Sequence, residues 1–172
     1  MRNLFIPLAF ALSLTICALT TCDAQSTAAK PVEPAAIGVV YRLDPTSREL
    51  KKLADEQWAE TQGSRDPRQI LIEVRGGQST FRIAAAEKIE FVFNTGSPEK
   101  VSLYAFEQKK NKRQFQTAKL RVTGGGEMIK GLPVEVSKYG DSSYRLIPTS
   151  PLNPGEYGIV IAGAVYTFGV DK

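Results

Sequence analysis

The C-terminal part of the chain contains three strand-like segments joined by short turns. They cover residues 144–148, 157–161 and 165–170, and each is rich in β-branched and aromatic residues. A Pro-Gly turn lies directly before Tyr157, which opens the second segment. Three consecutive short strands separated by turn residues are typical of an all-β domain.

The rest of the chain repeats this alternation of short strands and turns. We expect further strands at residues 37–43, 70–74, 80–83, 88–93, 101–106, 115–122 and 132–136. Gly76-Gly77 predicts a hairpin turn between the second and third of these. The segment 101–106 is apolar on both faces, which favours a central strand, and 115–122 is its expected hairpin partner. The profile predicts an antiparallel β-sandwich.

The segment that ends at Tyr157, Leu-Asn-Pro-Gly-Glu-Tyr, resembles the tyrosine corner of immunoglobulin-like and fibronectin-like sandwiches. The resemblance implies that residues 144–148, 157–161 and 165–170 are strands E, F and G. It also implies that the Tyr157 hydroxyl donates a hydrogen bond to the backbone upstream. The expected fold is therefore an immunoglobulin-like antiparallel β-sandwich, in which Pro154, Gly155 and Tyr157 have structural roles.

One region allows two interpretations. Residues 47–60 follow a capping-box pattern and carry apolar residues at helical spacing, which favours one short helix near the N-terminus. The alternative is a hairpin with residues 44–49 at its tip and 50–53 as the return strand. Trp58, the only tryptophan, is interpreted as a core residue, and a ligand-stacking platform is the alternative.

Residues 1–24 have the organisation of a secretory signal peptide, with Arg2 before an apolar run at residues 4–19. We expect cleavage after Ala24. The alternative is a lipoprotein signal, in which the mature chain begins at a lipidated Cys22. Both interpretations predict an exported protein, periplasmic or secreted, with no transmembrane span in the mature chain.

The mature chain is expected to consist of two parts. Residues 25–36 are rich in Ala, Ser, Thr and Pro, which predicts a flexible tether. Residues 37–172 are expected to form a single β-sandwich domain.

Several reaction types are excluded by composition. The chain has no histidine, and cleavage after Ala24 removes both cysteines, Cys17 and Cys22. Catalysis by Ser-His-Asp or Cys-His groups, imidazole or thiolate metal sites and disulfides are then impossible. Asp66 and Asp141 lie in expected turns, but neither belongs to an Asp-rich calcium loop. We expect no metal, no cofactor and no catalytic residue.

Carboxylate chemistry remains open, because two carboxyl groups about 5–9 Å apart can hydrolyse a glycosidic bond. Glu73 and Glu90 lie between apolar residues, which favours solvent-facing positions on alternating strands. The three glycines at 124–126 are not followed by the Gly-Lys-Ser/Thr of a phosphate-binding loop and predict a loop only.

Four cations are expected at one hairpin tip: Lys109, Lys110, Lys112 and Arg113. Such a tip can contact an anionic lipid or polymer at about 1 kcal/mol per cation. A solvated tip that keeps a sheet edge soluble is the simpler interpretation. The net charge of +4 falls short of the basic patch of a nucleic-acid-binding protein, so no nucleic-acid partner is expected.

The region 37–170 resembles short exported bacterial proteins of unknown function. The resemblance depends on Ile-Gly-Val-Val-Tyr at 37–41, residues 103–115, Pro-Gly-Glu-Tyr-Gly at 154–158 and Tyr-Thr-Phe at 166–168. We expect a non-enzymatic module that binds another envelope or secreted protein, or an anionic envelope polymer or lipid surface. The alternatives are a carbohydrate-active module or carboxylate-based hydrolase, and a structural subunit of an envelope assembly.

Overall fold

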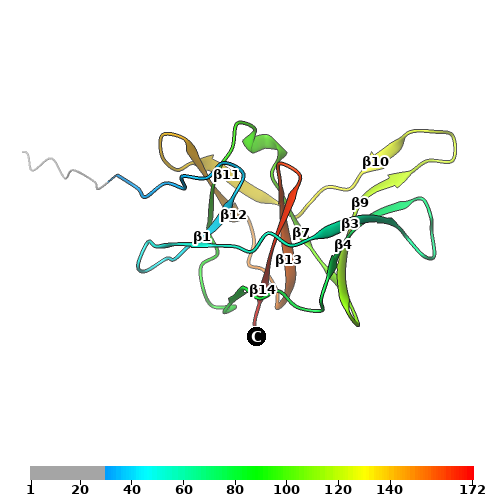
Figure 1. Cartoon of the computed structure of the whole chain (residues 1–172), viewed down its shortest axis with the longest axis horizontal. Helices are drawn as coiled ribbons and strands as arrows, with labels where there is room; N and C mark the ends of the chain where they lie inside the picture. Colours follow the sequence, from blue (N-terminus) through cyan, green and yellow to red (C-terminus); the bar gives the residue numbers. More distant parts are fainter. Residues whose placement is uncertain (1–29) are drawn as a thin grey trace, which may run out of the picture.

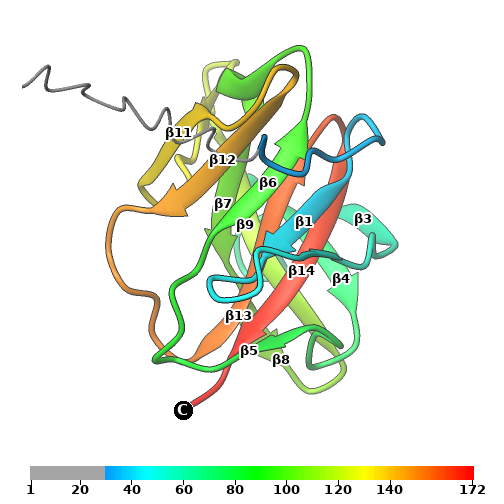
Figure 2. The same ribbon diagram turned by 90° about the vertical axis from the view of Figure 1, so that its left-hand side faces the viewer.

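The computed structural model describes residues 30–172. These residues form three β-sheets stacked as three layers (Figures 1 and 2). They contain no α-helix, and the one helical turn is the 3-10 turn η1 at Pro98–Lys100. The predicted signal peptide at 1–24 and the first part of the predicted tether lie outside the described residues.

The first sheet has five antiparallel strands in the order β11-β12-β6-β1-β2. Their bounds are Val134–Lys138 (β11), Ser143–Pro148 (β12), Phe91–Asn94 (β6), Val40–Leu43 (β1) and Leu50–Lys52 (β2). Phe91 and Phe93 point inward as predicted, because alternate residues of a strand face the same side.

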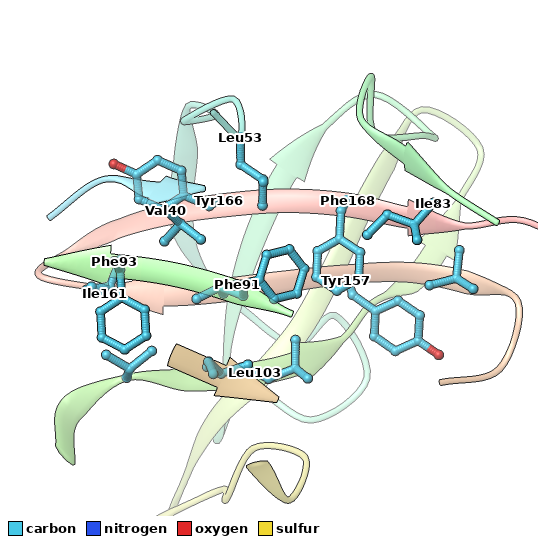
Figure 3. Close-up of a cluster of buried hydrophobic side chains, with 14 residues drawn as sticks. Val40, Leu53, Ile83, Phe91, Phe93, Leu103, Tyr157, Ile161, Tyr166 and Phe168 are labelled. Carbon is cyan, nitrogen blue, oxygen red and sulfur yellow. The ribbon is translucent and has the colours of Figure 1, made fainter. Parts of the chain in front are cut away.

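The middle sheet has the order β5-β14-β13-β7. Its strands are Arg82–Ile83 (β5), Ala164–Val170 (β14), Gly155–Ile161 (β13) and Ser102–Ala105 (β7). One face, which includes Tyr157, Ile159 and Phe168, packs against the first sheet and forms the main core (Figure 3). Phe91 and Phe168 meet there with their ring centroids 4.8 Å apart.

These two sheets have the strand order of an immunoglobulin sandwich. The neighbours β1-β6-β12-β11 correspond to strands A, B, E and D, and β7-β13-β14 correspond to C, F and G. The predicted strands E, F and G are therefore confirmed as β12, β13 and β14. The Tyr157 hydroxyl donates a hydrogen bond of 2.7 Å to the carbonyl oxygen of Asn153, so the predicted tyrosine corner is present.

The third sheet, which we call the accessory sheet, covers the other face of the middle sheet. Two separate segments build it, one between β2 and β5 and one between β7 and β11. Its strands are Trp58–Gln62 (β3), Gln69–Arg75 (β4), Glu107–Lys109 (β8), Lys112–Leu120 (β9) and Gly126–Met128 (β10). Ile72, Val74 and Phe115 pack against Phe106 and Val165 of the middle layer.

The preferred helix over residues 47–60 is wrong, and the hairpin alternative is confirmed. Strands β1 and β2 pair directly, with Leu43 opposite Leu50. The Asp44 carboxylate accepts hydrogen bonds of 2.9 Å from the amides of Thr46 and Ser47, so it closes a β-turn instead of capping a helix. Arg48 completes the turn in the left-handed region, at φ 62°.

Two predicted strand pairings are also wrong. Strand β7 pairs with β13 at the edge of the middle sheet, whereas β9 pairs with β4, β8 and β10. Strands β4 and β5 form no hairpin, because β5 crosses to the middle sheet and runs parallel to β14. The expected central position of this strand is wrong, because β7 is the last strand of its sheet. Both faces of β7 are nevertheless covered, since Leu103 lies in the main core and Tyr104 stacks on Phe115.

Part of the predicted tether contacts the domain. Pro34 is buried, and the Glu33 carboxylate accepts hydrogen bonds from the Ser143 hydroxyl and from the amides of Ser142 and Asp141, at 2.7, 2.9 and 2.7 Å. The Ser143 contact, followed by the amide contacts of Ser142 and Asp141, lowers the pKa of Glu33 to about 2.

Candidate functional site

The predicted cationic hairpin tip exists between β8 and β9, but its four cations do not share one surface. Lys109 forms an ion pair with Glu107, and Lys112 forms one with Glu73. Lys110 is exposed and has no ion pair among residues 30–172. Arg113 is 0% exposed, so it cannot contact an external surface. The hypothesis of a four-cation contact is therefore wrong for Arg113.

Arg113 instead connects the accessory sheet to the middle sheet. Its guanidinium lies 2.5 Å from a carboxylate oxygen of Glu56 and 3.5 Å from one of Glu156, and it also donates to the Ser79 hydroxyl. Its Nε donates to the Gly76 carbonyl oxygen at 3.1 Å. These partners compensate the buried charge, which explains how a cation can lie between two sheets.

The burial of Arg113 has a signal in the sequence. Arg113 lies two residues before Phe115 in the same strand, and residues at this spacing face the same side. Burial of Phe115 therefore takes Arg113 inward. Its partners Glu56, Ser79 and Glu156 come from three distant segments, so no local pattern identifies them.

The outer face of the accessory sheet carries a polar groove of about 650 Å³. Strands β4 and β9 form its floor, whereas the turn after β3 and strand β8 line its sides. Its lining residues are Thr61, Gln62, Gly63, Ser64, Arg65, Gln69, Leu71, Glu73, Glu107, Lys109, Lys112 and Gln114. We call this surface the outer groove.

A β-bulge shapes the floor of the outer groove. The register between β4 and β9 shifts between Ile70 and Leu71, which leaves Thr117 as the extra residue of β9. A bulge bends its strand and increases the local twist. The floor is therefore curved, and the side chains of Gln69 and Gln114 line the same groove.

Most charged groups in the outer groove are paired. Besides the Lys112–Glu73 pair, Glu107 contacts Lys109 and accepts a hydrogen bond of 2.9 Å from Gln114. The hydrogen bonds from Lys109 and Gln114, with a smaller effect of Arg65, hold the pKa of Glu107 below its ordinary value. Arg65 has no ion pair within the described chain, so it is the groove cation most available to a ligand.

The two strand carboxylates considered from the sequence are not equivalent. Glu73 is half-buried and paired with Lys112 in the outer groove. Glu90 is 3% exposed, which makes the prediction of a solvent-facing position wrong. Lys88 forms an ion pair with Glu90, and the Arg145 guanidinium lies 3.9 Å from its other oxygen. Glu73 lies in β4 of the accessory sheet, whereas Glu90 directly precedes β6 of the first sheet.

Trp58 is not a core residue, because 40% of it is exposed. Its indole Nε1 donates to the carbonyl oxygen of Gly163 at 3.2 Å, which holds the ring beside the turn between β13 and β14. The interpretation as a core residue failed because it assumed a helix whose apolar stripe ended at Trp58.

The described chain contains no group of three or more His, Cys, Asp or Glu residues placed to hold a metal ion. Asp66 forms an ion pair with Arg68 at 2.8 Å, which is the main reason that its pKa is lowered to about 2. Asp141 forms one with Lys30 at 2.5 Å.

No helix among residues 30–172 is both long and apolar enough to span a bilayer.

Comparison with known proteins finds no protein family, curated protein or solved structure that matches this chain.

Proposed function

We propose that the protein is an exported, non-enzymatic immunoglobulin-like module that binds an acidic glycan of the cell envelope in its outer groove. The observation that supports this most directly is a polar groove with a cation, Arg65, that forms no ion pair among residues 30–172, on a sheet that is additional to the immunoglobulin-like sandwich. Binding residues commonly lie on loops that a rigid scaffold positions, and Arg65 lies in the turn between β3 and β4.

The groove lining matches a ligand rich in hydroxyl groups. The amides of Gln62, Gln69 and Gln114 both donate and accept hydrogen bonds, as do the hydroxyls of Thr61 and Ser64. Arg65 adds a planar cation that can bind a carboxylate or phosphate group with two hydrogen bonds. The expected ligand is therefore a polysaccharide that carries acidic groups.

The geometry gives less support to a hydrolase. A general acid needs a carboxyl group whose pKa is raised towards the working pH. Glu107 is a carboxylate of the outer groove, and its contacts lower its pKa. The role of this carboxylate is to hold Lys109 and Gln114 in position.

The test measures binding of the purified exported protein to immobilised polysaccharides. Polygalacturonate supplies carboxylates, a glycerol phosphate polymer supplies phosphates, and dextran is neutral. We expect binding to one of the acidic polymers, and Arg65→Gln should weaken it about tenfold because a charged hydrogen-bond pair is lost. Lys110→Gln is the matched control, since it removes an exposed cation outside the groove.

Two results would contradict the proposal. The first is equal binding of the wild-type protein and Arg65→Gln together with weaker binding of Lys110→Gln. This result would indicate that the ligand binds at the hairpin tip between β8 and β9. The second is binding to vesicles of anionic phospholipid with no binding to any polysaccharide. Circular dichroism of each variant checks that the fold is unchanged.

A further inference from the structure

Strand β3 is an open edge of the accessory sheet. The order β10-β9-β4-β3 places β3 last, and on its outer side no strand pairs with it within residues 30–172. Four of its five residues are exposed. Its outward amide and carbonyl groups can therefore pair with another extended chain.

The other sheet edges are protected in ways that β3 is not. Strands β2, β5, β8 and β10 have at most three residues each. Strand β11 follows Pro133 and ends at Lys138, and Leu132 forms a bridge to Leu103 of β7. Proline, lysine and short length are the usual protections of an edge. Strand β3 has five residues and contains neither proline nor lysine.

A pocket of about 500 Å³ lies where β3 begins. Trp58 forms one wall with its partly exposed indole, which Gly163 holds through the hydrogen bond to Nε1. Asp55 lies on the same pocket and is exposed. An aromatic face beside a carboxylate is suited to a cationic side chain, through cation–π and ionic attraction.

The charge of this edge is acidic in a chain whose net charge is +4. Residues 53–64 contain Asp55, Glu56 and Glu60 but no Lys or Arg. The Glu56 carboxylate forms an ion pair with Arg113 and accepts a hydrogen bond from the Thr167 hydroxyl. Asp55 and Glu60 form no ion pair within the described chain, so their charges are available to a partner.

We propose that β3 binds an extended, basic segment of a partner protein by strand addition, with a Lys or Arg side chain of that segment in the Trp58 pocket. Backbone hydrogen bonds supply affinity in this mode, and pockets for alternate side chains supply specificity. A second copy of the chain fits less well, because antiparallel pairing centred on Glu60 places two like charges opposite each other. The pocket at Trp58 shares no residue with the outer groove, whereas Thr61 and Gln62 at the other end of β3 also line that groove.

The only tryptophan makes this site directly observable. The full exported protein is titrated with a peptide of about seven residues in which Lys alternates with Val or Thr, and with a peptide that has Glu in place of Lys. We expect a saturable change in Trp58 fluorescence with the Lys peptide. The Glu peptide should bind at least about tenfold more weakly.

Three variants locate the contact. Asp55→Asn and Glu60→Lys should each weaken binding of the Lys peptide, by about tenfold for the charge reversal. Glu127→Lys is the matched control, because it reverses an exposed carboxylate on β10, the opposite edge of the same sheet. Amide hydrogen exchange of β3 should slow in the complex, which a contact through side chains alone does not cause.

Three outcomes would overturn the proposal. One is the absence of a saturable fluorescence change with the Lys peptide. Another is equal weakening by Glu127→Lys and Glu60→Lys, which indicates a general charge effect. The third is self-association of the protein without peptide that Glu60→Lys abolishes, which makes a second copy the occupant of the edge.

Discussion

Single side chains satisfy the polar groups that turns leave without partners. The Tyr157 hydroxyl pairs with the Asn153 carbonyl, and its ring stacks on Phe168. Glu33 does the same for two amides and two hydroxyls of the turn between β11 and β12. In each case a few atoms determine how one segment meets the next.

Removal of the Tyr157 hydroxyl should lower stability measurably. Tyr157→Phe keeps the ring against Phe168 but leaves the Asn153 carbonyl without its donor. We expect a loss of about 1 kcal/mol in the free energy of unfolding, measured by chemical denaturation. Tyr139→Phe is the control, since the Tyr139 hydroxyl has no hydrogen bond within residues 30–172. Equal stability of the two variants would contradict the structural role of the corner.

The stability that the Glu33 hydrogen bonds contribute should depend on pH. The folded pKa of about 2 lies below the ordinary value of 4.5, so the contact contributes stability above about pH 4.5. This contribution should be lost as the pH falls from 4.5 towards 2. An NMR titration of the Glu33 carboxyl should give a midpoint near 2, and Glu33→Gln should speed amide exchange at Ser142. A midpoint near 4.5 would show that the segment is detached.

At the scale of elements, the sequence pattern predicts where a strand lies but not which other strand it pairs with. Period-2 alternation and turn residues located most strands, including β12, β13 and β14. The partners of β4, β7 and β9 were predicted incorrectly, because strands adjacent in the sequence were expected to form hairpins, whereas each of these strands pairs with a more distant one. Only contacts between distant segments decide this choice.

Removal of one partner from the buried ion pairs between the accessory and middle sheets should lower the stability of the protein. Arg113→Met leaves the Glu56 carboxylate without an ion pair among residues 30–172 and leaves buried Glu156 with Arg82 as its only cation, so we expect a loss of about 3 kcal/mol in the free energy of unfolding. Lys112→Met, in the same strand but on the outer face, should cost at most about 1 kcal/mol. Chemical denaturation measures both variants.

A second substitution can test whether the loss of stability comes from a carboxylate that is left without its cation. The double variant Arg113→Met with Glu56→Gln should be more stable than the sum of the two single losses predicts, because Glu56 has no other ion pair among residues 30–172 and neither charge of this pair is then left alone. Strictly additive losses would show that the two residues do not act as a pair.

At the scale of the whole molecule, the described N-terminal segment and the accessory sheet lie at opposite ends of the long axis (Figure 1). An anchor attached before residue 30 therefore leaves the outer groove and the β3 edge on the far side. This arrangement suits a module that reaches a ligand away from its point of attachment.

The predicted cleavage site of the signal peptide can be tested by mass spectrometry. Cleavage after Ala24 gives a chain that begins at Gln25 and contains no cysteine. The intact mass of the exported protein should equal that of residues 25–172. A larger mass with a lipid on Cys22 would instead support the lipoprotein alternative.

The sequence by itself determined the all-β class, the order of strands E, F and G and the corner at Tyr157. These features depend on residues close together in the chain, where backbone preferences and turn chemistry act directly. It also excluded histidine chemistry, which composition alone decides.

Only the tertiary structure decided which groups surround a buried charge and which sheet edges are open. The buried Arg113 is compensated by Glu56, Ser79 and Glu156, which come from three other segments, and Trp58 is exposed because β3 ends the accessory sheet. A charge is stable between two sheets only when such partners surround it, and their approach is a property of the folded chain.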